Sequence, residues 1–191
     1  MGFDSTPPNV SVRRPKPSDR RDISTLWNRR TGFEIERTLD AVFDEERAVY
    51  GLLATAADRI VGGGVVMVVA RGGVDEYFAV ETDDYPVGKR NAILHAGVVH
   101  EEWEGRGIGT ELMRRRVELV DRAHDVRSAF GTAWLRPGTA DASALFENVG
   151  FTRFDTVDDY YQRTDGDRDC PDCDATCTCA AAIYGRVLDR D

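Results

Sequence analysis

One segment, residues 92–123, constrains the fold of this chain more than any other: AILHAGVVHEEWEGRGIGTELMRRRVELVDRA. It combines an apolar strand, a turn with glycines at positions 105, 107 and 109, and an amphipathic helix directly after the turn. The first turn of a helix leaves backbone N–H groups without partners, and the helix dipole adds positive charge there. Because glycine has no Cβ, a bulky anion can approach those N–H groups closely. The segment therefore predicts an anion pocket, most naturally one for phosphates.

Two common phosphate-binding arrangements do not fit this segment. A Walker loop needs the triplet Gly-Lys-Ser/Thr, which the sequence does not contain. A dinucleotide-binding fingerprint belongs to the first strand–helix unit of its domain. Here the turn lies mid-chain and follows an expected β-hairpin, so the sequence argues against a dinucleotide fold.

The remainder of the chain alternates strand and helix patterns. Apolar and β-branched runs predict strands at residues 9–14, 48–56, 60–70, 92–99, 128–135, 151–157, 159–164 and 180–188. Periodic apolar positions predict helices from an N-cap at Ser18 through Trp27, over 33–48, after Gly107 and over 141–148. Residues 71–91 are polar and rich in Gly, Pro and Asp, which indicates a loop or a strand extension.

The first hairpin turns at residues 57–59, and the glycines at 62–64 predict a bulge or a close backbone approach. Antiparallel hairpins are thus mixed with a β-α-β crossover, which is right-handed as a rule. We expect a single domain over residues 1–191, an α/β fold whose mixed sheet carries helices on both faces.

The composition is that of a soluble globular protein with a strongly acidic surface. Hydrophobic residues make up 41% of the chain and charged residues 31%, and the net charge is −9. The only lysines are Lys16 and Lys89, so nearly all positive charge is arginine. The acidic excess indicates either an ordinary acidic surface or adaptation to high intracellular salt, and we favour the second. Nucleic acid is a poor partner in both cases, because phosphate contacts need clustered positive charge.

No apolar run reaches the ~20 residues that a membrane-spanning helix needs, so we expect no membrane partner. Residues 1–19 lack the apolar core of a signal peptide, which predicts a cytoplasmic location. The sequence leaves the oligomeric state open, a homodimer included.

Two segments resemble motifs of the GNAT superfamily of N-acetyltransferases. Residues 98–112, VVHEEWEGRGIGTEL, are similar to its pyrophosphate motif, an Arg/Gln-x-x-Gly-x-Gly/Ala core after a strand. Gly107 and Gly109 match the two motif glycines, and Trp103 occupies the usual aromatic position. Residues 144–151, ALFENVGF, are similar to the family's A-x-x-L-Y-x-x-x-G-F segment. The resemblance implies a GNAT-like, mostly antiparallel sheet that is split by an acetyl-CoA site.

The resemblance also implies a mechanism. Acetyl-CoA would lay its pyrophosphate on the turn and pair its pantetheine with the strand before it. An acceptor amine, on a small molecule or a protein, would attack the thioester directly while backbone donors near Val99 polarise the carbonyl. The residues implied to bind the cofactor are Val98, Val99, Gly105, Arg106, Gly107, Ile108, Gly109, Thr110, Phe146 and Asn148.

Two residues depart from the family pattern. Glu104 stands where the motif has Arg or Gln and places a negative charge beside a phosphate site. Phe146 stands where the family often has a tyrosine that acts as general acid. As general base we name His95, which lies four residues before Val99 and is expected on the same strand face. A structural or solvent-facing role for His95 is the alternative. The departures keep a second function open: a catalytically weak CoA-binding or zinc-linked regulatory module.

All the cysteines of the chain, Cys170, Cys173, Cys177 and Cys179, fall within one short segment. The acetyltransferase resemblance does not account for them. The spacing C-x2-C-x3-C-x-C gathers four soft ligands and suits a structural, tetrahedral Zn²⁺. Disulfides, an iron–sulfur cluster and free thiols are the alternatives.

Overall fold

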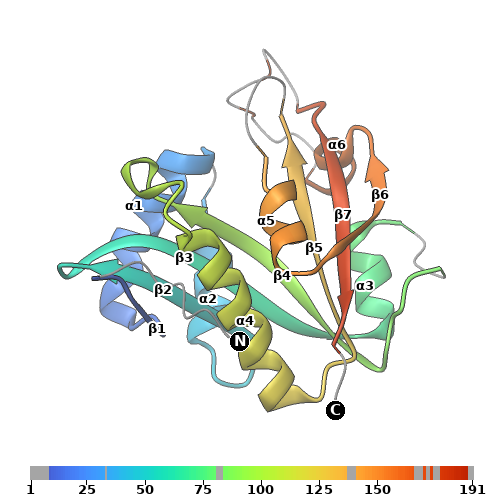
Figure 1. Cartoon of the computed structure of the whole chain (residues 1–191), viewed down its shortest axis with the longest axis horizontal. Helices are drawn as coiled ribbons and strands as arrows, with labels where there is room; N and C mark the ends of the chain where they lie inside the picture. Colours follow the sequence, from blue (N-terminus) through green and yellow to red (C-terminus); the bar gives the residue numbers. More distant parts are fainter. Residues whose placement is uncertain are drawn as a thin grey trace. The chain divides into compact units, whose positions relative to one another are not determined.

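The computed structural model describes residues 9–32, 34–80, 84–136, 141–165, 170, 173 and 177–188 (Figure 1). The described strands form a seven-stranded sheet in the order β1-β2-β3-β4-β5-β7-β6. The pairs β1–β2, β2–β3, β5–β7 and β6–β7 are antiparallel. The mixed, mostly antiparallel α/β fold expected from the sequence is therefore confirmed. The chain divides into two compact units, Met1–Met67 with Leu94–Leu119, and Val68–Ile93 with Val120–Asp191.

The first unit holds the N-terminal strands and the predicted anion-binding segment. Its elements are β1 (Ser11–Arg13), η1 (Pro17–Asp19), α1 (Arg20–Thr31), α2 (Glu36–Phe43), β2 (Val49–Ala56), most of β3 (Arg59–Ala70), the end of β4 (Arg90–Val99), η2 (Glu101–Trp103) and the start of α4 (Ile108–His124).

Two apolar clusters cover opposite faces of the strands in this unit. Ile108 and Leu112 of α4 pack with Leu52 and other buried strand residues, and α4 lies across β2 and β3 (Figure 1). Trp27 of α1 and Leu39 of α2 pack with the other set of strand side chains. In the first unit the helices therefore lie on both faces of the sheet, as expected.

The β2–β3 hairpin follows its sequence pattern closely. Ala57 and Asp58 both have positive φ, 46° and 63°, the signature of a tight two-residue hairpin turn. The register shifts at Ala54 and Thr55, so the bulge predicted near the glycines is present. A Cβ on Gly63 would lie 2.9 Å from the Trp27 ring, so the predicted close approach is also present.

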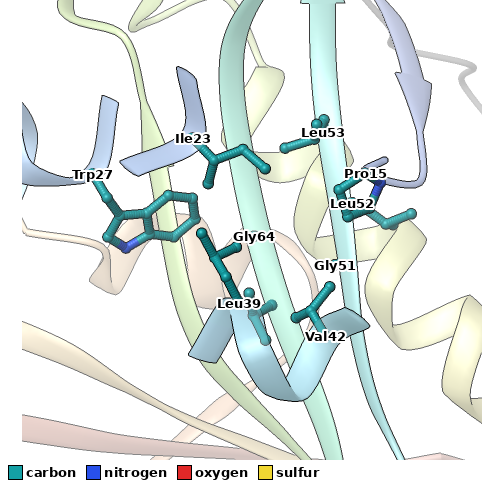
Figure 2. Close-up of a pocket in the computed structure, with 10 residues that line it drawn as sticks. Pro15, Ile23, Trp27, Leu39, Val42, Gly51, Leu52, Leu53 and Gly64 are labelled. Carbon is teal, nitrogen blue, oxygen red and sulfur yellow. The ribbon is translucent and has the colours of Figure 1, made fainter. Parts of the chain in front are cut away.

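A small apolar hollow lies between the α1–α2 layer and the β2–β3 strands. Figure 2 shows Ile23 and Trp27 of α1 and Leu39 and Val42 of α2 around it. Its lining offers no charged side chain, and Trp27 and Leu39 belong to the core of the unit. We assign it to core packing.

The second unit contains the C-terminal strands and an aromatic core. Its elements are α3 (Arg71–Phe78), the start of β4, the end of α4, β5 (Ser128–Leu135), α5 (Ser143–Asn148), β6 (Thr152–Val157), α6 (Tyr160–Asp165) and β7 (Ala180–Val187). Phe130 of β5 packs edge-on against Phe78 at a ring separation of 6.4 Å. Phe146 of α5 stacks on Tyr184 of β7.

Two elements differ in type from their prediction. Residues 71–78 form a helix, although Gly72 and Gly73 lower the helix propensity of this segment. Val74 and Phe78, one helical turn apart, are both fully buried, so tertiary packing outweighs local preference. Residues 160–165 are also helical, where a strand was predicted.

Two helix boundaries differ as well. The second helix covers Glu36–Phe43 only, shorter than the predicted 33–48, and Phe33 lies outside the described residues. Ser18 is not an N-cap: it belongs to η1, and α1 starts at Arg20 with Asp19 before it. Across the described part of the chain, no helix has the length and apolarity that a membrane crossing requires.

Candidate functional site

The turn between β4 and α4 has the geometry that its glycines predict. Gly105 and Gly107 have φ values of 70° and 81°, which favour glycine. The carbonyl of Gly107 accepts the first helical bond, from the N–H of Glu111 at 3.0 Å. The N–H groups of Ile108, Gly109 and Thr110 come before the first bonded N–H, so they have no carbonyl partner within the helix.

Apolar packing fixes where this helix begins. Ile108 is buried among Leu112 and strand residues of the first unit, while the turn residues 104–107 are exposed. One residue before η2, the N–H of His100 donates to the carbonyl of Val61 at 2.9 Å and ties the strand end to β3. The start of α4 is thus held by its core while its N–H groups face an exposed turn.

The negative charge of Glu104 has a partner. Its carboxylate is ion-paired with Arg30 in the last turn of α1. Arg29, in the same turn, pairs with Glu101, and Arg30 also lies 3.7 Å from Glu101. The carboxylate of Glu104, the residue that departs from the family motif, is therefore paired with a positive charge from α1. Nothing local in the sequence signals this, because 74 residues separate the partners.

The positive side chain of the turn is also held in place. The Arg106 guanidinium lies over the Trp103 ring, 4.8 Å from its centroid. An arginine stacked on an indole keeps its charge while losing rotamer freedom. Arg106 thus brings a positioned positive charge to the start of α4.

His95 does not share a face with Val99 as expected. Its Nε2 atom lies 3.2 Å from Oγ1 of Thr38 on α2. Val99 packs against the α4-side cluster, and Val98 belongs to the α1–α2 cluster. Strict alternation along β4 thus fails between His95 and Val99. His95 is half-buried and hydrogen-bonded to a hydroxyl, which fixes its ring.

Sequence reasoning missed Arg116 of α4. Its guanidinium is buried and donates to three backbone carbonyls: Leu112 at 3.1 Å, Val65 at 3.0 Å and Ala96 at 2.7 Å. Burial lowers the pKa of Arg116 to about 10. The sequence did hold a signal for this burial: Arg116 lies four residues after the apolar Leu112, and residues four apart share a helix face.

The α5 segment is described within the second unit alone. The Phe146 ring is buried, parallel to Tyr184 at 4.9 Å and edge-on to Phe151 at 5.3 Å. Tyr184 donates its hydroxyl to Glu147 at 3.3 Å, and Asn148 is exposed. Contacts of Phe146 and Asn148 with a cofactor stay predictions.

The four cysteines come together in the second unit. The sulfur atoms of Cys170, Cys173, Cys177 and Cys179 all lie within 4.8 Å of one another. Cys179 is 3.9 Å from Cys170 and 3.7 Å from Cys173, sulfur to sulfur. Burial raises the pKa of the Cys179 thiol to about 12.

A family model decides the classification. The model of the acetyltransferase (GNAT) family matches residues 18–151. The chain belongs to this family. The matched range includes both motif segments, 98–112 and 144–151, and the strand–turn–helix that opens the site. The cysteine segment, residues 170–179, lies outside the range that the GNAT model matches.

Solved structures of other proteins share the fold. The ribosomal-protein-S18-alanine N-acetyltransferase from Escherichia coli has a TM-score of 0.64 at 17% identity, covering 95% of this chain and 96% of its own. Arabidopsis thaliana Naa50, in complex with the bisubstrate analogue CoA-Ac-MVNAL, has a TM-score of 0.62 at 14% identity, covering 94% and 99%. An agmatine N-acetyltransferase mutant has a TM-score of 0.66 at 15% identity, covering 94% and 100%. A search of curated protein sequences found no match.

Proposed function

We propose that this GNAT protein transfers the acetyl group of acetyl-CoA to an amine. The observation that carries the proposal is the turn before α4. Positive φ at Gly105 and Gly107, the free start of the helix and the pairing of Glu104 with Arg30 together make an exposed anion cradle. The pyrophosphate of acetyl-CoA would accept hydrogen bonds from the N–H groups of residues 106–110. Arg106 would add a positive charge.

The transfer step uses the strand that leads into this turn. The pantetheine would pair along Val98 and Val99, with backbone donors near Val99 polarising the thioester carbonyl. The amine nitrogen forms the new C–N bond, and the C–S bond then breaks to release the CoA thiolate. One proton leaves the nitrogen and one joins the thiolate, so the step balances. We assign His95 as the base that takes the amine proton: its ring does not share a face with Val99, but it is half-buried on the same strand and is oriented by Thr38.

The acceptor belongs to the class of primary amines, on a small molecule or at a protein N-terminus. Structurally similar proteins support this class: one is a ribosomal-protein-S18-alanine N-acetyltransferase and another is an agmatine N-acetyltransferase. The net charge of −9 would favour a cationic amine.

Direct binding and product formation test the proposal. Acetyl-CoA should raise the melting temperature, and mass spectrometry should find an acetylated amine in a panel of polyamines and N-terminal peptides at low and high salt. Product detection is preferable to thiol reagents, because the protein itself carries four cysteines.

A matched pair of variants isolates the cradle. Gly107→Trp should abolish acetyl-CoA binding, whereas Gly32→Trp should retain it. Gly32 has the same sign of φ, 74°, and open space around a would-be Cβ. Binding that survives in Gly107→Trp would show that the turn is not the cofactor site. Binding without any acetylated product would favour the second candidate, a CoA-binding module, which Phe146 in place of the family tyrosine already suggests.

A further inference from the structure

The separations within the cysteine cluster match one tetrahedral metal ion. A Zn–S bond of about 2.3 Å gives sulfur–sulfur edges of about 3.8 Å in a regular tetrahedron. The two measured edges are 3.7 Å, between Cys173 and Cys179, and 3.9 Å, between Cys170 and Cys179. All four sulfur atoms fit within 4.8 Å of one another. The ligand set is thus already close to the size of a single-ion site.

The surroundings of the cluster suit a closed, structural site. Cys170, Cys177 and Cys179 are buried. Cys179 directly precedes β7, whose first residues pair with the end of β5 at Leu135 and Trp134. Trp134 pairs with Ala181 at the start of β7, and the Arg136 guanidinium lies 4.7 Å from the centre of the Trp134 ring. Arg136 directly follows Leu135, which pairs with Ala180 next to Cys179, so it brings a positive charge to this end of the two strands. A tetrathiolate site carries net negative charge, which such a cation helps to offset.

The competing chemistries fit less well. A disulfide requires a sulfur–sulfur distance of about 2.05 Å, well below either measured edge. An iron–sulfur cluster binds its cysteines through several iron atoms, which sets the four sulfur atoms farther apart than one ion does. Four free thiols packed together would form only weak hydrogen bonds, because S–H is a weak donor and sulfur a weak acceptor.

We propose that Cys170, Cys173, Cys177 and Cys179 bind one Zn²⁺ as a structural tetrathiolate site. On binding, four S–H groups lose four protons and form four Zn–S bonds, with no change of oxidation state. The ion ties the start of β7 to the segment that precedes it. The site lies outside residues 18–151, so it is a feature of this chain added to the matched family region. It stands independently of the proposed acetyl transfer.

Metal analysis of the full-length protein tests the site. Protein purified under reducing conditions, without added metal, should contain one zinc per chain by elemental analysis and by native mass. Replacement by Co²⁺ should produce the intense sulfur-to-cobalt charge-transfer and d–d bands of tetrahedral thiolate coordination. Acid-labile sulfide with iron, or cysteines that stay unreactive until reductant is added, would overturn the assignment.

Two variants separate ligand loss from general damage. Cys177→Ser should lose the zinc and the cobalt spectrum, whereas Thr178→Ser, one residue along, should keep both. Should Cys177→Ser not fold, wild-type protein stripped of zinc replaces it: re-addition of one equivalent of Zn²⁺ should raise the melting temperature by several degrees. A melting temperature that does not respond to zinc, with four alkylatable thiols, would refute the proposal.

Discussion

The guanidinium of Arg30, in the last turn of α1, is ion-paired with the carboxylate of Glu104, in the turn that opens α4. Glu104 is the residue at which the chain departs from the GNAT pyrophosphate motif. Arg29 pairs in the same way with Glu101. Two arginines of one helix turn thus offset two carboxylates beside the proposed cradle.

Removing Arg30 should weaken cofactor binding through charge alone. Arg30→Gln leaves Glu104 unpaired near the phosphates, and an exposed charge pair is worth about 1 kcal/mol. We expect KM for acetyl-CoA to rise about threefold to tenfold at low salt. The increase should shrink at high salt because ions screen exposed charges.

A second substitution checks the cause. The double variant Arg30→Gln/Glu104→Gln should restore KM to near the wild-type value, because the unpaired charge is gone. Arg21→Gln makes the same charge change at an exposed position of α1 and should leave KM unchanged. If Arg21→Gln raises KM equally, the effect comes from overall charge and not from the pair.

The second prediction concerns His95. His95→Gln should lower kcat by about 100-fold or more and should remove the limb of the pH–rate profile near the histidine range, the signature of a lost general base. Thr38→Val removes only the hydroxyl 3.2 Å from Nε2 of His95. It should lower kcat less than His95→Gln does and should keep the histidine limb of the pH–rate profile, shifted in pH. A His95→Gln enzyme with wild-type kcat would assign the ring to a structural role.

Local patterns were enough to predict the elements that carry the motifs. The β4–turn–α4 unit is encoded by glycine spacing and an amphipathic stripe, and the β2–β3 hairpin by its apolar runs. Helix α3 could not be read this way, since its stability comes from burying Val74 and Phe78. At 160–165 a run of aromatic and polar residues resembles a strand, but Tyr161 packs on Trp134 from a helix.

In the candidate site, too, the local features could be predicted from the sequence and the long-range contacts could not. The cradle and the cysteine cluster are local in sequence, so spacing alone indicated both. The partners of Glu104 and Arg116 are not local: Arg30 lies on a distant helix, and the carbonyl of Val65 lies 51 residues before Arg116. Such contacts exist only once the sheet has formed and brought its helices into place.

The third prediction is a pH dependence of stability at Asp19. Arg13 donates to both carboxylate oxygens of Asp19, at 2.7 and 2.9 Å, and lowers the pKa of that carboxyl. A carboxyl with a lowered folded-state pKa stabilises the fold above its unfolded pKa, and this contribution is lost as pH falls through the folded value. Asp19→Asn should therefore cost about 1 kcal/mol of unfolding free energy between pH 5 and 8. The difference should shrink as pH falls below about 4 and disappear only below the lowered folded-state pKa.

Urea unfolding at several pH values measures this difference. Asp22→Asn removes an acidic charge from the first turn of α1, which follows Asp19. Asp22 is exposed, so this variant should give a smaller loss without the same drop below pH 4. Equal pH profiles for the two variants would contradict the role of the Arg13–Asp19 pair.

The fourth prediction concerns the buried guanidinium of Arg116. Arg116→Met keeps an unbranched side chain of similar length but removes the donors to the carbonyls of Val65 and Ala96. Leaving buried carbonyls without a donor costs about 1–3 kcal/mol each, while removing a buried charge recovers part of its desolvation cost. We expect a net loss of about 2–3 kcal/mol in unfolding free energy, measured by urea titration at pH 7.

The control for Arg116 lies on the same helix. Arg122 is exposed, so Arg122→Met should change stability by about 0.5 kcal/mol or less. Gly64 tests the placement from the strand side, because a Cβ there would lie 2.6 Å from Cζ of Arg116. Gly64→Ala should therefore be destabilising in the wild type and cost less in an Arg116→Ala background, where the guanidinium is gone. If the cost of Gly64→Ala is the same in both backgrounds, the guanidinium does not lie over β3, and the loss in Arg116→Met needs another cause.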